Sequence, residues 1–264
     1  MGLSCRCDQV EEVPLTETDA YFSDGLESGN AVLLVHGFTG SPHSLLGVAK
    51  YLESGGLKVT LPQLPGHGTN IDDLLDKEFD DWYSSAATVA TRLLDSCARV
   101  DLFGLSMGGS IVLKLLESFN GFGRAVLVNP LVEPPASSFL DLMKSILESG
   151  FAVAPGISSD VAKPDSLELG YKETPIKAAL SLFDALPDIA NNLGAIKNEI
   201  LLFSSRQDHV VPKSSGELLV NSLRSARLRR VWLDRSFHVA TLDYDAELIS
   251  NLSLEFFRGP QGGV

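Results

Sequence analysis

Cysteine is scarce in this 264-residue sequence, which contains only Cys5, Cys7 and Cys97. An odd and small number of cysteines excludes a disulfide framework. Cys5 and Cys7 are spaced closely enough for a metal-binding pair, but no second pair of cysteines or histidines has a matching spacing. Because a structural metal site needs about four such ligands, we expect no metal and no other cofactor.

Long apolar runs are also missing. No stretch approaches the roughly 18 apolar residues of a membrane span, and the first residues lack the apolar region of a secretory signal. Met1-Gly2 begins like a myristoylation site, but Arg6 occupies the position that requires Ser or Thr. We therefore expect a cytoplasmic protein without integral membrane association, present as a monomer or small homo-oligomer.

Positive charge is in short supply, since 21 Lys and Arg against 34 Asp and Glu give a net charge of −13. An acidic surface repels nucleic acids and anionic membranes, so neither is expected as a partner. Hydrophobic residues make up 44% of the chain, which is enough for a sizeable core. The length suits one large domain better than two.

Six short segments have the composition of β-strands. Several are near-continuous apolar runs such as AVLLV, which is typical of strands buried on both faces of a parallel sheet. The predicted strands are Ala31–Val35, Leu57–Leu61, Arg99–Phe103, Arg124–Asn129, Glu199–Ser204 and Arg229–Leu233.

Segments with helical spacing lie between these strands. Alternating strands and helices predict βαβ units, and therefore an α/β fold with a mostly parallel sheet between two layers of helices. Residues 13–30 are expected to add an antiparallel edge hairpin. The predicted helices are Ser41–Ser54, Asp80–Cys97, Met107–Phe119, Pro212–Leu223 and Asp243–Phe257.

The alternation stops between Leu131 and Leu193, where no strand is predicted. Prolines separate apolar, helix-like pieces such as SSFLDLMKSILESGFAV and IKAALSLFDALPDIA. These pieces are either ordinary helices covering the sheet or an insertion lying over it. We favour the insertion, with residues 1–130 and 194–264 forming the core and residues 131–193 forming a small helical cap.

The most specific motif is Gly104-Leu105-Ser106-Met107-Gly108, which matches G-x-S-x-G between a predicted strand and a predicted helix. The glycines allow a tight strand–turn–helix connection that exposes the serine hydroxyl at the carboxyl end of the sheet. The helix that starts there directs positive backbone dipoles toward a developing oxyanion. The motif predicts Ser106 as a nucleophile.

A second glycine-rich segment, HGFTG, directly follows the first predicted strand. In folds with such a serine turn, the oxyanion hole combines the amide after the nucleophile with one from an early loop. The backbone N–H groups of Phe38 and Met107 are the candidates. His36 and His67 precede the nucleophile and are expected to be structural.

The partners of the nucleophile are predicted from chain order. His238 is the only one of five histidines that follows the last predicted strand. The loop after the strand at 199–204 contains Asp208, and Asp234 is the runner-up for the acid. The order Ser106, Asp208, His238 is that of α/β-hydrolases. His238 would accept the serine proton, and Asp208 would fix the histidine tautomer.

These motifs together resemble the carboxylesterase and monoacylglycerol lipase group of the α/β-hydrolases, including the Geobacillus-type thermostable carboxylesterases. The resemblance covers roughly residues 30–258 and rests on VHGFTGSP, PGHG, GLSMGG, RQDHVVP and HVATLD. It implies the α/β-hydrolase fold with a small helical cap at residues 131–193. It also implies the same triad, Ser106, Asp208 and His238, with oxyanion amides at Phe38 and Met107.

One position departs from the pattern, because the family usually has Gly before the catalytic histidine and this chain has Phe237. A phenylalanine adopts positive φ only at a cost. We expect its ring to form part of the pocket wall, and a core position is the alternative. The rest of the substrate pocket is expected to come from cap residues, namely Phe139, Met143, Ile146 and Phe183.

The residues predict a serine carboxylic ester hydrolase that forms an acyl-enzyme on short- to medium-chain esters, with monoacylglycerols as one natural class. The alternatives are another chemistry on the same triad (peptidase, thioesterase, carbon–carbon hydrolase or acyltransferase) and, more remotely, a non-enzymatic binding protein. A histidine base predicts that activity falls on acidification, with an apparent pKa near or slightly below about 6.5.

Overall fold

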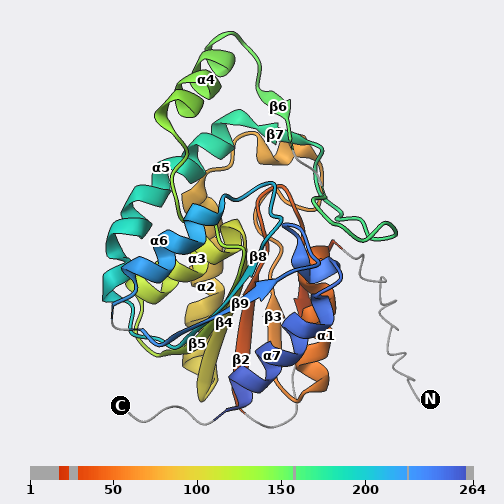
Figure 1. Ribbon diagram of the computed structural model, residues 1–264, viewed down its shortest axis with the longest axis vertical. Coiled ribbons are helices and arrows are strands. Elements are labelled where there is room, and N and C mark those ends of the chain that lie inside the picture. The colour runs from red at the N-terminus through yellow and green to blue at the C-terminus, as the bar shows by residue number, and fades with distance from the viewer. Residues whose placement is uncertain (1–17, 24–28, 157–158, 225, 260–264) are drawn as a thin grey trace, which may run out of the picture.

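The computed structural model describes residues 18–23, 29–156, 159–224 and 226–259. A seven-stranded sheet in the order β1-β3-β2-β4-β5-β8-β9 forms its centre (Figure 1). All neighbouring strands are parallel except β1 and β3, which confirms the predicted mostly parallel sheet. The strands are β1 Tyr21–Phe22, β2 Asn30–Val35, β3 Lys58–Leu61, β4 Arg99–Leu105, β5 Phe122–Val128, β8 Ile200–Ser205 and β9 Leu228–Leu233.

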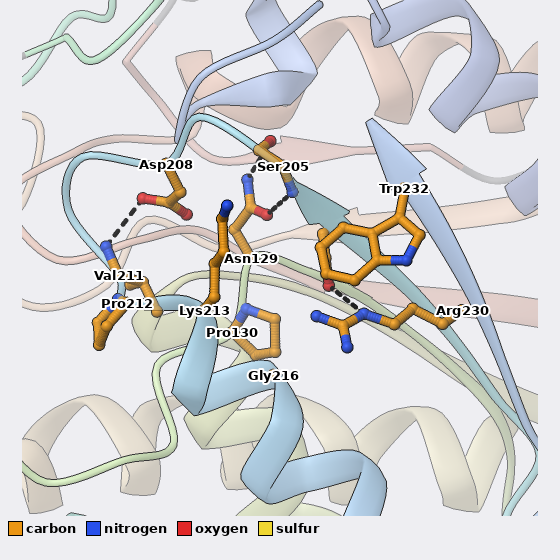
Figure 2. Close-up of a pocket in the computed structure, with 11 residues that line it drawn as sticks. Asn129, Pro130, Ser205, Asp208, Val211, Pro212, Lys213, Gly216, Arg230 and Trp232 are labelled. Atoms are coloured by element: carbon orange, nitrogen blue, oxygen red, sulfur yellow. Dashed lines mark hydrogen bonds between the residues drawn. The ribbon is translucent and has the colours of Figure 1, made fainter. Parts of the chain in front are cut away.

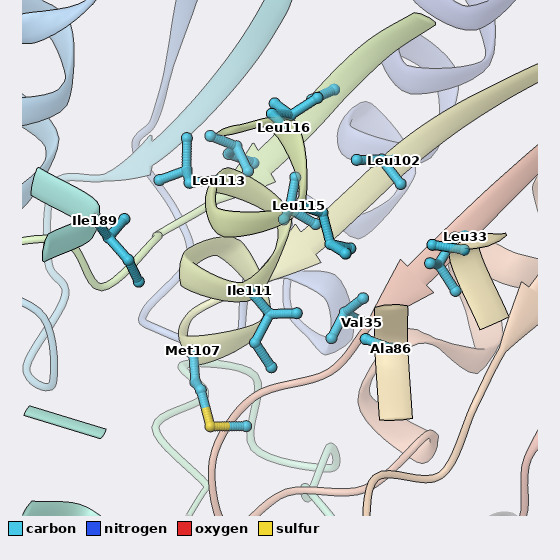
Figure 3. Close-up of a cluster of buried hydrophobic side chains, with 14 of the residues drawn as sticks. Leu33, Val35, Ala86, Leu102, Met107, Ile111, Leu113, Leu115, Leu116 and Ile189 are labelled. Carbon is cyan, nitrogen blue, oxygen red and sulfur yellow. The ribbon is translucent and has the colours of Figure 1, made fainter. Parts of the chain in front are cut away.

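Helices cover both faces of the sheet. Successive residues of a strand point to opposite faces, so each buried strand contributes side chains to two apolar cores. In β2, Leu33 and Val35 belong to one apolar core with α2, α3, α5 and α6 (Figure 3). Val32 and Leu34 belong to the other core with α1 and α7. The helices are α1 His43–Ser54, α2 Phe79–Ser96, α3 Met107–Ser118, α5 Ile176–Asn192, α6 Lys213–Ser222 and α7 Ala246–Arg258, with 3-10 turns at Ile71–Leu74, Leu193–Ala195 and Ala240–Leu242.

The N-terminal edge of the sheet tests the expected hairpin only in part, because residues 13–17 and 24–28 lie outside the described ranges. Strand β1 is antiparallel, as predicted, but it pairs with β3 and not with the next strand in sequence, β2. The parallel pairing of β2 with β3 and β4 occupies both edges of β2. The nearest free edge for β1 is therefore that of β3.

The segment between β5 and β8 contains two short strands that the sequence did not predict. Val153–Pro155 (β6) and Glu173–Pro175 (β7) form a separate antiparallel pair. Each strand has only three residues and ends at a proline, so neither shows the alternating pattern by which a longer strand is recognised in a sequence. The helix α4, Ser137–Glu148, and this pair lie beyond the end of the central sheet (Figure 1).

The two helices of this segment are buried to different extents. Leu186 and Ile189 of α5 are fully buried in the core that also includes α3. In α4 only Met143 is buried, whereas Phe139 and Leu142 are 45% and 57% exposed. Helix α5 therefore stabilises the sheet core, and α4 stands apart from it.

No helix within the described ranges combines the length and apolar composition needed to cross a bilayer.

Two leucines of this segment test the difference between the helices. Leu186 is fully buried and Leu142 is 57% exposed. We expect Leu186→Ala to lower the free energy of unfolding by about 2–5 kcal/mol, because it opens a cavity in the core. Leu142→Ala is expected to change it by less than about 0.5 kcal/mol. Urea denaturation of both variants measures this; equal losses would show that α4 is as much a part of the core as α5.

Candidate active site

Ser106 lies at a sharp turn between β4 and α3. Its backbone has φ 54° and ψ −120°, a conformation that costs a non-glycine residue free energy. Hydrogen bonds hold this strained backbone in place: Ser106 N–H donates to the Val128 carbonyl (3.0 Å), and the Ser106 carbonyl accepts from Leu131 N–H (3.2 Å). The residue is 9% exposed and lines the largest cavity described below.

The glycines of the motif are required by close packing. A Cβ at Gly104 would lie 2.5 Å from the Gly108 carbonyl oxygen, and one at Gly108 would lie 2.0 Å from the Val35 carbonyl oxygen. Real Cβ atoms do not approach backbone this closely, so only glycine lets α3 start directly against β2. A Cβ at Gly37 would lie 3.4 Å from the Ser106 Cβ, which places the HGFTG loop beside the serine.

His238 and Asp208 face each other at the carboxyl edge of the sheet. His238 Nδ1 is 2.8 Å from Asp208 Oδ2, and the two side chains are 8% and 5% exposed. The other oxygen, Asp208 Oδ1, accepts the N–H groups of Val210 (2.9 Å) and Val211 (2.8 Å). The Val211 bond is visible in Figure 2. The carboxylate is thus oriented by its own loop toward the histidine.

Ser106 and His238 line the same cavity. No hydrogen bond joins their side chains in the described structure, which is a common state of such a pair before substrate binds.

The pKa of His238 reflects two opposing effects. Burial lowers it. The Asp208 carboxylate, through its charge and its hydrogen bond, and then Glu168 and Asp160 raise it by more than burial lowers it, so the pKa lies above the ordinary value of 6.5. This direction differs from the expectation of a midpoint near or slightly below 6.5. The sequence located Asp208 but did not indicate two more carboxylates around the ring.

The runner-up acid does not approach His238. Asp234 is 69% exposed and is paired with Arg206, whose Nε lies 2.6 Å from Asp234 Oδ1. His209, next to Asp208, points away from it and pairs with Asp160 (2.8 Å).

Among the described residues, two backbone amides beside the serine have no acceptor. Met107 is the first residue of α3, so its N–H has no partner within the helix. Phe38 N–H donates to no protein group in the part of the chain that the structure describes. Both residues line the cavity with Ser106. The two predicted oxyanion donors therefore border one space with the serine.

His36 and His67 are buried beneath this loop, as expected of structural histidines. His36 Nδ1 lies 2.9 Å from the Gly37 carbonyl, and its Nε2 accepts the Leu64 N–H. Burial lowers the pKa of His36 to about 4 and that of His67 well below its ordinary value. Both rings are therefore neutral near pH 7, and the His67 ring packs edge-on against Phe38.

A cavity of about 800 Å³ lies between Ser106 and the segment at 131–193. This volume falls in the range of small-molecule sites. Four of the five predicted pocket residues line it: Phe139, Met143, Ile146 and Phe183. A second cavity, beneath Asp208, measures about 20 Å³ and is too small for a substrate (Figure 2).

Phe237 is the predicted pocket residue that does not line the cavity. Its ring packs edge-on against the His209 ring, with centroids 4.5 Å apart. Its φ is not positive, so the backbone strain expected from replacing glycine does not arise. The Phe237 N–H donates to Asp243 Oδ2 (2.9 Å). The ring is half-buried, and it occupies neither the pocket wall nor the core.

Cys5 and Cys7 lie outside the described residues. Within the described ranges, no three His, Cys, Asp or Glu side chains are grouped as a metal ion would require.

The family model described as serine aminopeptidase S33 matches residues 27–245 of this sequence. The chain belongs to this family. Over 234 residues it is 37% identical to the thermostable monoacylglycerol lipase of Bacillus sp. (strain H-257), an alignment that covers 88% of this chain and 91% of that protein. It is 27% identical over 233 residues to a carboxylesterase of Bacillus subtilis (strain 168), covering 86% and 92%.

Solved structures agree with this assignment. A structure described for the metagenome-derived lipolytic enzymes LipS and LipT is 32% identical, with a TM-score of 0.86 over 92% of this chain and 98% of that one. The monoacylglycerol lipase of Paleococcus ferrophilus has a TM-score of 0.73 over 90% and 98%, at 18% identity, which supports the fold alone. The chain is an α/β-hydrolase and a serine ester hydrolase of the lipase and esterase type, as the sequence predicted.

Sequence reasoning missed Glu168, which lines the cavity from the stretch between β6 and β7. Burial raises its pKa to about 7, although the electrostatic effect of His238 opposes this shift. A loop carboxylate among many acidic residues carries no signal in the sequence. Only the fold shows that it lies in the same cavity as Ser106 and His238.

Sequence reasoning also missed Asn129, which was assigned to the end of a predicted strand. Its amide Nδ2 donates to Ser205 Oγ (2.9 Å) and to the His238 carbonyl (2.8 Å), and its Oδ1 accepts Ser205 N–H (2.7 Å). Figure 2 shows the contacts with Ser205. Asn129 has φ 44° and is 5% exposed. It links the end of β8, just before the Asp208 loop, to the backbone of His238.

The raised pKa of His238 predicts the pH dependence of this hydrolase. A histidine base accepts a proton only when it is neutral, so kcat/KM for p-nitrophenyl acetate is expected to fall as the pH decreases through a midpoint above about 6.5. Asp234→Asn is the control and is expected to leave the midpoint unchanged, because this exposed carboxylate is paired with Arg206. A wild-type midpoint at or below 6.5 would contradict the charge balance described for His238.

Removal of the Asn129 amide is expected to lower kcat for p-nitrophenyl butyrate by roughly 10- to 100-fold with little change in KM, since small displacements of reacting groups are this costly. The variant Asn129→Gly is suitable because glycine tolerates φ 44°. Asn198→Ala is the matched control: its Nδ2 also donates to two backbone carbonyls, of Phe122 (2.9 Å) and Gly123 (2.7 Å), at the other end of β5. Equal kinetic losses in both variants would count against a role for Asn129 at the site.

Proposed function

We propose that this hydrolase cleaves monoacylglycerols and related short- to medium-chain esters through an acyl-enzyme on Ser106. The observation that carries the proposal is one cavity lined by Ser106, by His238, which is bonded to Asp208, and by Phe38 and Met107, whose backbone amides have no acceptor among the described residues. None of these groups alone indicates a reaction, but together they supply the nucleophile, the base, the acid and the oxyanion donors that acyl transfer requires.

The first half-reaction breaks the ester bond. Ser106 Oγ attacks the carbonyl carbon while His238 Nε2 takes the hydroxyl proton, and the developing oxyanion accepts hydrogen bonds from Phe38 and Met107 N–H. Asp208 stabilises the imidazolium. Collapse of the tetrahedral intermediate expels the alcohol oxygen, which takes the proton from His238.

The second half-reaction restores the enzyme. A water molecule gives a proton to His238 and attacks the acyl-serine carbonyl, and Ser106 leaves with the proton that His238 returns. The products are one alcohol and one carboxylic acid, so the overall change is hydrolysis without any other reactant.

The cavity lining supports an ester with a long apolar side and a polar alcohol. Phe139, Leu142 and Met143 of α4 and Phe183 of α5 line it with apolar groups suited to an acyl chain. Glu168 lies close enough to His238 to affect its pKa, and both residues line the cavity. A buried carboxyl group there would accept hydrogen bonds from free hydroxyls such as those of glycerol. The relative named as a monoacylglycerol lipase supports the same substrate class.

The segment at 131–193 is part of the proposal, as a cap over the site that supplies the acyl-binding wall. Exposed Phe139 and Leu142 support this role, because both line the cavity while contributing little to the core.

Loss of the nucleophile tests the reaction. Ser106→Ala is expected to lower kcat for p-nitrophenyl esters by roughly 10⁴-fold or more and to abolish labelling by a fluorophosphonate probe. Asp208→Asn is expected to lower kcat severely, whereas Asp234→Asn, its exposed counterpart, changes it little. Normal turnover by Ser106→Ala, or labelling at another residue, would refute the proposed nucleophile.

Removal of the Glu168 carboxyl tests the alcohol. We expect Glu168→Ala to lower kcat/KM for a monoacylglycerol by roughly 10-fold relative to the methyl ester of the same acid, since a hydrogen bond contributes about 0.5–1.5 kcal/mol. Glu133→Ala is the matched control, because Glu133 also lines the cavity but is already bonded to Ser214. Parallel losses on both esters in Glu168→Ala would show that Glu168 does not bind the alcohol.

A further inference from the structure

A carboxylate from the segment over the site contacts the backbone of His238. Asp160 Oδ2 accepts the N–H of His238 (3.0 Å), and the Asp160 carbonyl accepts the N–H of Val239 (3.0 Å). The Asp160 side chain is 9% exposed and lines the cavity. One residue therefore holds two consecutive amides of the base loop, the connection between β9 and α7 that carries His238, and it precedes His238 by 78 positions in the chain.

The same carboxylate also reaches the loop that carries the acid. Asp160 Oδ1 lies 2.8 Å from His209 Nδ1, and Asp160 Oδ2 accepts the His209 N–H at 3.2 Å. His209 follows Asp208 directly in sequence. Asp160 thus connects the backbones of both loops whose side chains meet in the His238–Asp208 pair.

We propose that Asp160 is a positioning residue that fixes the backbone of His238 relative to the Asp208 loop and so couples the segment over the site to catalysis. This inference rests on the proposed function, in which His238 is the base. Asp160 touches the backbone of the base and not the reacting atoms, so its effect passes through the orientation of the His238 ring.

A second carboxylate strengthens the connection from the opposite side. Asp243 Oδ2 accepts the N–H groups of Ala162 (2.7 Å) and Phe237 (2.9 Å), and Asp243 Oδ1 accepts that of Lys163 (3.1 Å). The stretch at 159–163 and the base loop therefore each supply a carboxylate that binds backbone amides of the other. Movement of this stretch away from the site would break both sets of bonds and release His238.

Asp160 also acts through its charge. The groups that act electrostatically on His238 are Asp208, Glu168 and Asp160, and all three raise its pKa against the effect of burial. Asp160 faces His209 as well, which is 54% exposed. Loss of the Asp160 charge alone therefore lowers the pKa of His238, even where the hydrogen bond to its backbone is retained.

Two variants separate geometry from charge. Asp160→Ala removes both, and we expect kcat for p-nitrophenyl butyrate to fall by roughly 10- to 100-fold with KM changed by less than about 3-fold. Asp160→Asn keeps an oxygen acceptor for His238 N–H, so kcat is expected to stay within about 3-fold of wild type. In this variant the acid limb of kcat/KM shifts to lower pH, because a charge that raises the pKa of His238 is gone.

The control is Asp101→Asn. Asp101 is also a buried carboxylate that accepts a backbone N–H, from Arg124 (2.6 Å), and it lies near the start of β4, away from the serine. This variant is expected to lose stability without a shift of the acid limb. Thermal unfolding of all three variants reports folding, and Asp160→Asn carries the test if Asp160→Ala fails to fold.

The inference is overturned if the acid limb of Asp160→Asn coincides with that of wild type, or if folded Asp160→Ala retains wild-type kcat. Failure of the proposed function has a different signature, since Ser106→Ala would then remain active. An inactive Ser106→Ala together with unaffected Asp160 variants would leave the esterase mechanism intact and remove only the role of Asp160.

Discussion

The strained turn at Ser106 is the constraint on which the site depends. Its φ of 54° is costly for any residue with a side chain, and the closest packing around it, between Gly108 and the Val35 carbonyl, admits no Cβ. The free energy of this turn is offset by the buried strands on either side, since β4 pairs along its length with β2 and β5. The parallel sheet therefore does more than carry the serine, because its strands hold in place a backbone conformation that an isolated turn would not maintain.

The same geometry brings the other site residues together, because parallel strands all end at one edge of the sheet. Asn129 follows β5, Asp208 follows β8 and His238 follows β9, and hydrogen bonds connect these loops directly. The cross-links are made largely by side chains to backbone groups. Such bonds fix the position of a loop through its backbone, as at Phe237, whose N–H and carbonyl are both bonded while its side chain is not constrained by them.

Much of the fold and part of the site could be predicted because the signals are local. The buried strands are apolar runs, the serine turn has glycines at fixed spacing, and the order of Ser106, Asp208 and His238 follows the order of the strands. The partner of β1, the β6–β7 pair, and the contacts of Asn129 and Asp160 could not be predicted. Each depends on groups about 20 to 110 residues apart, and an Asn or Asp that binds distant backbone has the same local pattern as one exposed to water.

The charges around His238 give the segment at 131–193 a part in the proposed mechanism beyond that of a cap. Burial alone would lower the pKa of the ring, and a single carboxylate at Asp208 is opposed by that cost. Asp160 and Glu168, both from this segment, add negative charge beside the ring and raise its pKa further. A shape-complementary cover could exclude water with apolar side chains only. This one also supplies charge that favours the imidazolium form of His238. In the proposed mechanism that form carries the proton taken from the serine, so the same stretch of chain would enclose the substrate and stabilise the transferred proton.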